Sequence, residues 1–125
     1  MRLSSRTIAD CREGPVDFRR PASEIAADVH FADRGLHPTV FTRFRGRLLV
    51  ICAARSGGVI SPYPPGTIIR CDEEIWVQTG GGHLIIESLR DQDGSEYPAH
   101  VFLRVHGADA GTRFQLPAQE ISHAA

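Results

Sequence analysis

The stretch that most constrains the fold of this chain is HPTVFTRFRGRLLVICAAR, residues 37–55. Its first part alternates as a strand with one buried face does. One face carries Val40, Thr42 and Phe44, and the other carries Phe41, Arg43 and Arg45. Its second part, residues 48–53, is an uninterrupted apolar run, which is typical of a strand covered on both faces. We therefore expect two strands joined through Arg45-Gly46, with the second strand in the middle of a sheet.

The segments around this ribbon predict one helix before it and short strands after it. A helix is expected from Pro21, which favours the first helical position, and Gly35 is placed to end it. Its apolar stripe, at i, i+3, i+4 and i+7, consists of Ala22, Ile25, Ala26 and Val29. Strands are expected at residues 67–70, 74–79 and 83–89, separated by Gly- and Pro-rich turns. Residues 97–106 favour a second, short helix, with Val101, Phe102 and Val105 at helical spacing.

Five short strands punctuated by Gly and Pro indicate a mainly β fold. We expect a small OB-like β-barrel preceded by one α-helix, with a second short helix near the C-terminus. A length of 125 residues is typical of a single domain. Residues 1–20 are interpreted as a linker or arm that touches the domain at residues 16–18, residues 21–116 as the barrel domain, and residues 117–125 as a tail.

Several functional classes are disfavoured by residue content and spacing. The three cysteines, Cys11, Cys52 and Cys71, have no CxxC spacing, which argues against a disulfide framework or a zinc site. The six histidines show no metal-binding spacing, so neither a metal nor a cofactor is expected. No apolar run approaches the roughly 18 residues of a membrane span, and the N-terminus lacks a signal-peptide pattern. These features predict a cytoplasmic protein without membrane contact.

Positive charge is concentrated in the first half of the chain. Residues 1–60 carry ten arginines and six acids, whereas residues 61–125 carry four arginines and nine acids, and there is no lysine. Guanidinium groups are suited to bidentate contacts with phosphate or carboxylate. The candidate binding residues are Arg43, Arg45, Arg47 and Arg55, with Arg19 and Arg20 upstream and Phe41 and Trp76 as aromatic platforms. The alternative is a solvated hairpin face that the acidic second half neutralises.

The run Thr79-Gly80-Gly81-Gly82 has the composition of a phosphate-binding loop. No helix start follows it, and strand residues lie on both sides, so a hairpin turn is predicted instead. No nucleophile motif is present, and we expect no catalytic residue in this chain.

Several segments resemble, in order and spacing, the C-terminal domain of the methionyl-tRNA formyltransferase family. They are VDF (16–18), PASEI (21–25), PGTII (65–69), EIWVQTGGG (74–82), LIIE (84–87), FLR (102–104) and GTRF (111–114). The resemblance covers nearly the whole chain and implies an OB-like barrel with an N-terminal helix. In the family this domain follows a Rossmann-like catalytic domain that uses Asn, His and Asp to transfer a formyl group from formyltetrahydrofolate, and those motifs are absent here.

Two further segments depart from the family pattern. Its tRNA enzymes carry IRA in the helix and a following WPGA segment; here these are VHF (29–31) and LHPT (36–39). The leading hypothesis is a non-catalytic module that binds a separate formyltransferase catalytic protein, a substrate or a tRNA-like RNA. The second is a C-terminal fragment of a longer 10-formyltetrahydrofolate-dependent formyltransferase that contributes a tRNA-binding or substrate-positioning surface. The third is a small enzyme with a pocket of its own. The oligomeric state is left open.

Overall fold

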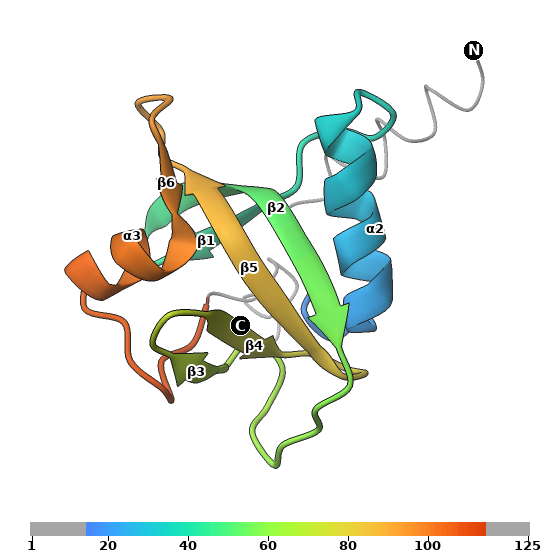
Figure 1. Cartoon of the computed structure of the whole chain (residues 1–125), viewed down its shortest axis with the longest axis vertical. Coiled ribbons are helices and arrows are strands. Elements are labelled where there is room, and N and C mark those ends of the chain that lie inside the picture. Colours follow the sequence, from blue (N-terminus) through green and yellow to red (C-terminus); the bar gives the residue numbers. More distant parts are fainter. Residues whose placement is uncertain (1–14, 115–125) are drawn as a thin grey trace, which may run out of the picture.

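The computed structural model describes residues 15–114, which form a mainly β domain with two helices (Figure 1). Residues 1–14 of the predicted linker and the whole predicted tail lie outside this part. In chain order the elements are α2 (Ala22–Asp33), β1 (Phe41–Phe44), β2 (Arg47–Gly57), β3 (Ile68–Cys71), β4 (Ile75–Gln78), β5 (His83–Arg90), β6 (Glu96–Pro98) and α3 (Ala99–Val105).

The strands form one antiparallel sheet in the order β1-β2-β5-β4-β3, with β6 paired to β5. β2 lies between β1 and β5, which confirms the central position predicted from its apolar run. The pairing of β2 with β5 shifts register between Ile51 and Ala54, and such irregularities increase the local twist of a sheet. The sheet curls into an OB-like half-barrel, so the predicted fold class is confirmed (Figure 1).

The hairpin of β1 and β2 closes as predicted, with Phe44 opposite Arg47 and Arg45-Gly46 as the two-residue turn. Both turn residues have positive φ, 51° and 82°, as a type I′ hairpin turn requires. The alternation of β1 is also confirmed, because Val40, Thr42 and Phe44 are buried whereas Arg43 and Arg45 are exposed.

A cluster of three phenylalanines joins the two edges of the curled sheet. The ring of Phe114 lies 5.4 Å from the rings of both Phe18 and Phe44, and all three side chains are buried. Phe44 belongs to β1, and the backbone N–H of Phe114 donates to the carbonyl of Gly66, just before β3. The edges β1 and β3 are therefore linked through aromatic packing.

Both predicted helices are present, but of the three apolar residues noted at helical spacing in the second only Phe102 is buried. In α2, which runs beside β2, the predicted stripe is confirmed by the burial of Ala22, Ile25 and Val29 (Figure 1). In α3 the buried residues are Ala99, Phe102 and Leu103, whereas Val101 and Val105 are exposed. The reason is the unpredicted strand β6, because its pairing with β5 fixes where α3 begins and turns Ala99 toward the sheet.

Candidate binding sites

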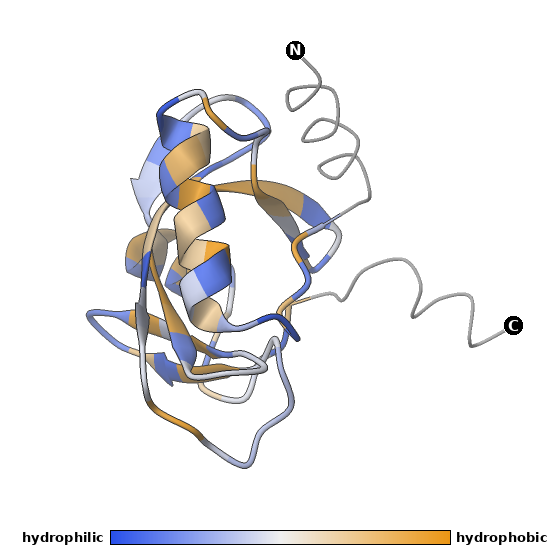
Figure 2. Ribbon diagram, turned by 90° about the vertical axis from the view of Figure 1, so that its right-hand side faces the viewer, coloured by the Kyte–Doolittle hydropathy of each residue, from blue (hydrophilic) through white to orange (hydrophobic). Residues whose placement is uncertain are grey.

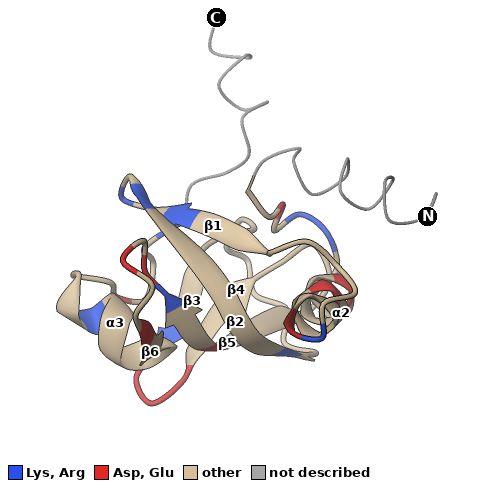
Figure 3. Ribbon diagram, turned by 90° about the horizontal axis from the view of Figure 1, so that it is seen from above, with Lys and Arg blue, Asp and Glu red and all other residues tan. Residues whose placement is uncertain are grey.

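The four arginines predicted as one basic patch lie at two separate places, three at the β1–β2 turn and one near the far end of β2. Basic residues gather at the closed end of the β1–β2 hairpin (Figure 3). Arg43 lies on β1, Arg45 in the turn and Arg47 at the start of β2. Arg55 lies near the other end of β2, opposite Ile85 of β5. At a rise of about 3.3 Å per residue, Arg47 and Arg55 are about 25 Å apart. The structure brings three of the four arginines together and leaves Arg55 out.

At the hairpin, two of the three arginines are held by groups of the domain itself. The Nη1 of Arg45 donates to the carbonyl of His106 at 3.2 Å. The Nη1 of Arg47 lies 3.4 Å from both carboxylate oxygens of Asp91. The side chain of Arg43 is exposed and makes no hydrogen bond or ion pair with residues 15–114. Only Arg43 is therefore left to offer an unpaired charge at this turn.

Arg55 belongs to an exposed cluster of ion pairs on the outer face of β2, β4 and β5. Its Nη2 donates to Glu74 at 2.7 Å and its Nε to Glu87 at 3.0 Å. Glu74 also accepts the indole N–H of Trp76 at 2.9 Å. That bond, followed by the hydrogen bond and the charge of Arg55, lowers the pKa of Glu74, and burial opposes this. Arg55 is thus neutralised by two carboxylates.

Trp76, predicted as an aromatic platform, has two side chains of the domain packed against its ring. The guanidinium carbon of Arg70 lies 4.9 Å from the Trp76 ring centroid, and the His83 ring lies 4.2 Å from it. Arg70 is held in turn by Asp72 at 2.8 Å. Two side chains of the domain therefore already contact the ring that was predicted to stack on a base.

The two arginines upstream of the helix are also paired. The guanidinium of Arg19 donates to both carboxylate oxygens of Asp17, at 2.9 and 3.1 Å, and lowers the pKa of that carboxyl. Arg20 donates to Asp28 at 2.8 Å and to Glu24 at 3.4 Å. These contacts bind the N-terminal segment to itself and to α2.

One unpaired face remains on the outer side of β1, β2 and β5. Phe41 is half-buried opposite Val50, and Val50 lies opposite Arg90, so the three form a row across the strands. Arg43 lies two residues along β1 from Phe41 and so shares this face. Within residues 15–114 the side chain of Arg90 makes no hydrogen bond or ion pair, and Glu96 lies opposite it on β6. Arg90 was not predicted from sequence patterns, because the pairing that places it beside Val50 joins residues 40 positions apart.

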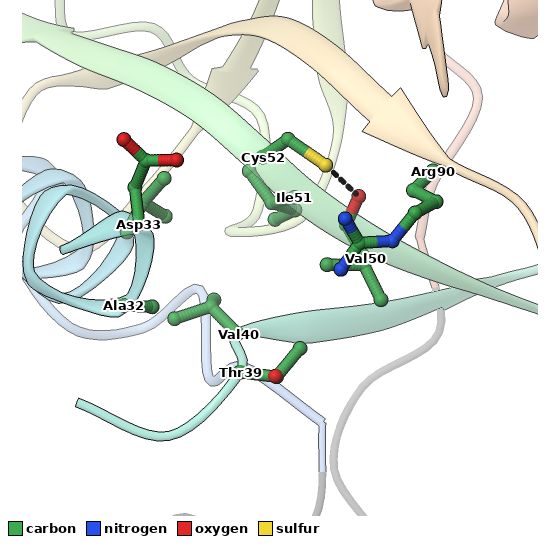
Figure 4. A pocket seen from close by; sticks show the side chains of 9 residues that line it. Ala32, Asp33, Thr39, Val40, Val50, Ile51, Cys52 and Arg90 are labelled. Carbon is green, nitrogen blue, oxygen red and sulfur yellow. Dashed lines mark hydrogen bonds between the residues drawn. The ribbon is translucent and has the colours of Figure 1, made fainter. Parts of the chain in front are cut away.

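Beside this face, a cleft of about 200 Å³ opens between the C-terminal half of α2 and β2. Asp33 and Arg90 stand on opposite sides of it, with the thiol of Cys52 between them (Figure 4). The thiol donates to the carbonyl of Val50 at 3.8 Å, and burial raises its pKa. Because the thiolate is the reactive form, Cys52 is a weak nucleophile at neutral pH. The cleft brings together no paired acid and base.

The glycine run is a hairpin turn between β4 and β5, as predicted. The N–H of Gly80 donates to the carbonyl of Phe18 at 3.0 Å, and the carbonyl of Gly81 accepts from the N–H of Ala22 at 2.9 Å. A Cβ on Gly80 would lie 1.7 Å from the carbonyl oxygen of Arg19. The turn therefore receives the chain segment before α2, and the missing side chain makes the close contact possible.

A second connection at the same end of the sheet, residues 58–65 between β2 and β3, will be called the apolar loop. It extends away from the sheet (Figures 1 and 2). Ile60 is 82% exposed and Tyr63 is 53% exposed. Two buried side chains hold its base: His83 Nδ1 accepts the N–H of Val59 at 3.0 Å, and Gln78 Oε1 accepts the N–H and hydroxyl of Ser61 at 2.9 and 2.6 Å. Sequence patterns predicted the loop but not these contacts.

Comparison with known proteins decides the family. The sequence pattern of the family described as formyl transferase, C-terminal domain, matches residues 10–107. The chain belongs to this family. This confirms the resemblance drawn from the motifs between residues 16 and 114.

Two curated relatives of this formyl transferase C-terminal domain are methionyl-tRNA formyltransferases. That of Paraburkholderia phymatum is 32% identical over 105 residues, which are 83% of this chain and 32% of the relative. That of Burkholderia ambifaria is 31% identical over 106 residues, which are 84% of this chain and 32% of the relative. The chain thus spans about a third of the length of the curated relatives that it matches.

Solved structures of HypX from Aquifex aeolicus share the fold of this formyl transferase C-terminal domain. A multiply substituted variant superposes with a TM-score of 0.57 at 16% identity, over 77% of this chain and 18% of HypX. The complex of HypX with tetrahydrofolic acid gives a TM-score of 0.54 at 18% identity, over 74% of this chain and 16% of HypX. At this level of identity the likeness concerns the fold alone.

Within residues 15–114 this formyl transferase C-terminal domain has no group of three or more His, Cys, Asp or Glu side chains placed to hold a metal ion. Neither helix of that range is long and apolar enough to cross a membrane. The remaining candidates for binding are the face around Arg43, the cleft beside α2 and the apolar loop.

Proposed function

We propose that this formyl transferase C-terminal domain is a non-catalytic module that binds a protein, the catalytic part of a formyl-transfer system. The observation that carries the proposal is the pairing of its arginines. Of the six arginines predicted to bind, all but Arg43 are held by carboxylates or a carbonyl of the same domain. A surface that neutralises its own cations attracts phosphate weakly, since non-specific RNA affinity depends on free Lys and Arg.

The family relationship supports the same reading. The curated relatives are methionyl-tRNA formyltransferases of which this chain matches about a third. The motifs associated with formyl transfer from formyltetrahydrofolate belong, by resemblance, to the catalytic domain that precedes this domain in the family. A module of this kind acts on formyl transfer through contact with that catalytic part.

A second candidate is favoured by the unpaired face around Arg43. If these residues act as the C-terminal part of a longer 10-formyltetrahydrofolate-dependent formyltransferase, Arg43 and Arg90 could contact phosphates while Phe41 stacks on a base. Two phosphate contacts would make log K fall by about 2 for each tenfold increase in salt.

Three measurements on the purified full chain separate these candidates. The proposal expects no formyl transfer from formyltetrahydrofolate by the chain alone, and capture of a formyltransferase, identified by mass spectrometry, from a lysate of the source organism. It also expects tRNA binding to be unaffected by Arg43→Ala, with Arg55→Ala as the matched control at a paired arginine. Turnover by the chain alone contradicts the proposal. So does salt-dependent tRNA binding that Arg43→Ala weakens and Arg55→Ala does not.

A further inference from the structure

The apolar loop lies in the longest stretch of the described chain without charge. No acidic or basic side chain occurs from Ser56 to Ile69. The charges nearest in sequence, Arg55 and Arg70, are both paired with carboxylates. The tip therefore offers no attraction to phosphate groups of nucleic acids or of lipid headgroups, whereas an uncharged protein surface meets no electrostatic penalty there.

Gln78 fixes the shape of this loop from beneath. Its side chain is buried, and its Oε1 accepts both the N–H and the hydroxyl of Ser61. Its Nε2 donates to the carbonyls of Thr79 and Gly82, both at 3.0 Å. Its backbone carbonyl accepts the N–H of Gly66 at 2.8 Å, where the loop rejoins the sheet. One buried residue thus ties the middle and the far end of the loop to the β4–β5 turn.

His83 fixes the near end of the loop. Its ring is 4% exposed, lies against Trp76, and sits so close to Gly57 that a Cβ there would be 2.1 Å from Cε1. Because Nδ1 accepts the N–H of Val59, the neutral ring carries its proton on Nε2, which is buried without a partner. A buried donor left unpaired lowers the stability of the fold. The domain keeps this donor unpaired at the residue that holds the loop, although the exposed tip of the loop contributes no contacts to the core.

An exposed apolar tip on a loop that is held at its base contributes more to binding a partner than to the stability of the fold. An isoleucine that is 82% exposed gains little stability from its position. Ordering it in advance, with prolines at 62, 64 and 65, lowers the entropy lost on association. Tyrosine is enriched at protein interfaces. The tip alone is smaller than the roughly 800 Å² that each partner contributes to a standard interface, so it fits an anchor that enters a concave pocket better than a flat contact between two copies.

We propose that the apolar loop is the docking element through which this domain holds its protein partner, with Ile60 as the anchor in an uncharged, apolar pocket of that partner. Gln78 and His83 are positioning residues, because they keep the loop in its binding shape without touching the partner. This inference rests on the proposed function, and its partner is the formyltransferase of that proposal.

The test uses the tagged full chain and the formyltransferase that the wild-type chain captures from the source lysate, produced as a recombinant protein. Ile60→Ser removes the anchor at an exposed site, so the fold is retained. Val105→Ser is the matched control, since Val105 is 76% exposed on α3. We expect Ile60→Ser to weaken binding by about tenfold or more and Val105→Ser to leave it unchanged. Amide exchange of Val59 and Ser61 should be unaltered in both variants.

Each outcome decides between the two proposals. Loss of binding in Ile60→Ser alone, with the amides still protected, supports the docking role. Equal binding by wild type and Ile60→Ser overturns the docking role and leaves the proposed function standing. If the wild-type chain captures no formyltransferase, the proposed function fails and the docking role fails with it. Loss of amide protection in Ile60→Ser together with lost binding assigns the residue to loop structure and also overturns its role as the anchor.

Discussion

Two connections lie side by side at one end of the sheet, and one is covered by the domain whereas the other is exposed to solvent. The register pairs Gly57 with His83 and His83 with Gln78, so the apolar loop and the β4–β5 turn leave the sheet at the same edge. The turn, Thr79 to Gly82, consists of a threonine and three glycines, and the segment before α2 covers it. The loop keeps large side chains and points them into solvent.

The difference shows where each connection finds its partner. The glycine turn is satisfied within the domain, because its backbone groups hydrogen-bond to Phe18, Arg20 and Ala22. The apolar loop is satisfied at its base by Gln78 and His83 but not at its tip. Most arginines of the domain are paired, whereas Ile60 and Tyr63 at the tip of the loop remain exposed to solvent. The following predictions test whether the two connections are as different as their contacts indicate.

The largest effect is expected on the covered side, from Phe18→Ala. Phe18 is fully buried and packs against Phe114 at 5.4 Å. Truncation of a buried phenylalanine lowers the free energy of unfolding by about 3–5 kcal/mol. Urea unfolding of the full chain measures it, with Val105→Ala as an exposed control expected to change stability by less than about 0.5 kcal/mol. A loss under about 1 kcal/mol would mean that residues 15–20 are not part of the folded domain.

The next effect compares one glycine from each connection. A Cβ on Gly80 would overlap the carbonyl oxygen of Arg19, whereas a Cβ on Gly58 would meet nothing within 4 Å. Gly80→Ala should therefore lower the free energy of unfolding by about 3 kcal/mol, as overpacking against backbone does. Gly58→Ala should change it by less than about 0.5 kcal/mol. Equal effects of the two substitutions would contradict the difference between the covered turn and the open loop.

The sequence predicted those parts of the molecule that depend on local pattern. The Arg45-Gly46 turn, the stripe of α2 and the glycine turn all follow from periodicity and from glycines placed between strand patterns. The face of α3 was missed because it depends on the three-residue strand β6, which is too short to show a period.

The state of the arginines could not be predicted for a different reason. Arg45 reaches a carbonyl 61 residues away, and Arg47 reaches a carboxylate 44 residues away. Charge counts show that acids are present in the second half of the chain, but only the sheet register shows which arginine each acid meets. The clamp of Gln78 on Ser61, across 17 residues, was hidden in the same way.

A smaller effect is expected from Gln78→Leu, which keeps a buried side chain of similar size. It leaves the N–H of Ser61 and the carbonyl of Thr79 without their partners, whereas the carbonyl of Gly82 still accepts from the N–H and the hydroxyl of Thr79. Because loop groups can turn to water, we expect a loss of about 2 kcal/mol rather than the sum of two buried groups. Amide exchange should speed up at Ser61 and Gly66 but not across the β1–β2 hairpin. Unchanged exchange at Ser61 would show that the loop is ordered without this clamp.

The smallest effect concerns pH and the near end of the loop. Burial, followed by the charge of Arg55 on β2, lowers the pKa of His83 below its ordinary value of 6.5, and the charge of Glu74, just before β4, opposes this. The unfolded chain thus binds a proton more readily than the folded one between the two pKa values. Stability from His83 is complete above pH 6.5 and is lost as the pH falls through the lowered pKa. Protonation also places a hydrogen on Nδ1, where the N–H of Val59 is bound.

His83→Gln isolates this contribution, because glutamine does not titrate and still offers an oxygen to Val59. Urea unfolding of both proteins between pH 8 and pH 5 should give stabilities whose difference changes below pH 6.5, with the wild type losing more. Over the same range, exchange at the Val59 amide should rise in the wild type relative to the variant, while exchange at Gly80 in the covered turn stays parallel in the two. Parallel stability profiles would show that His83 remains neutral or is solvated when charged, and the apolar loop would then be held independently of pH.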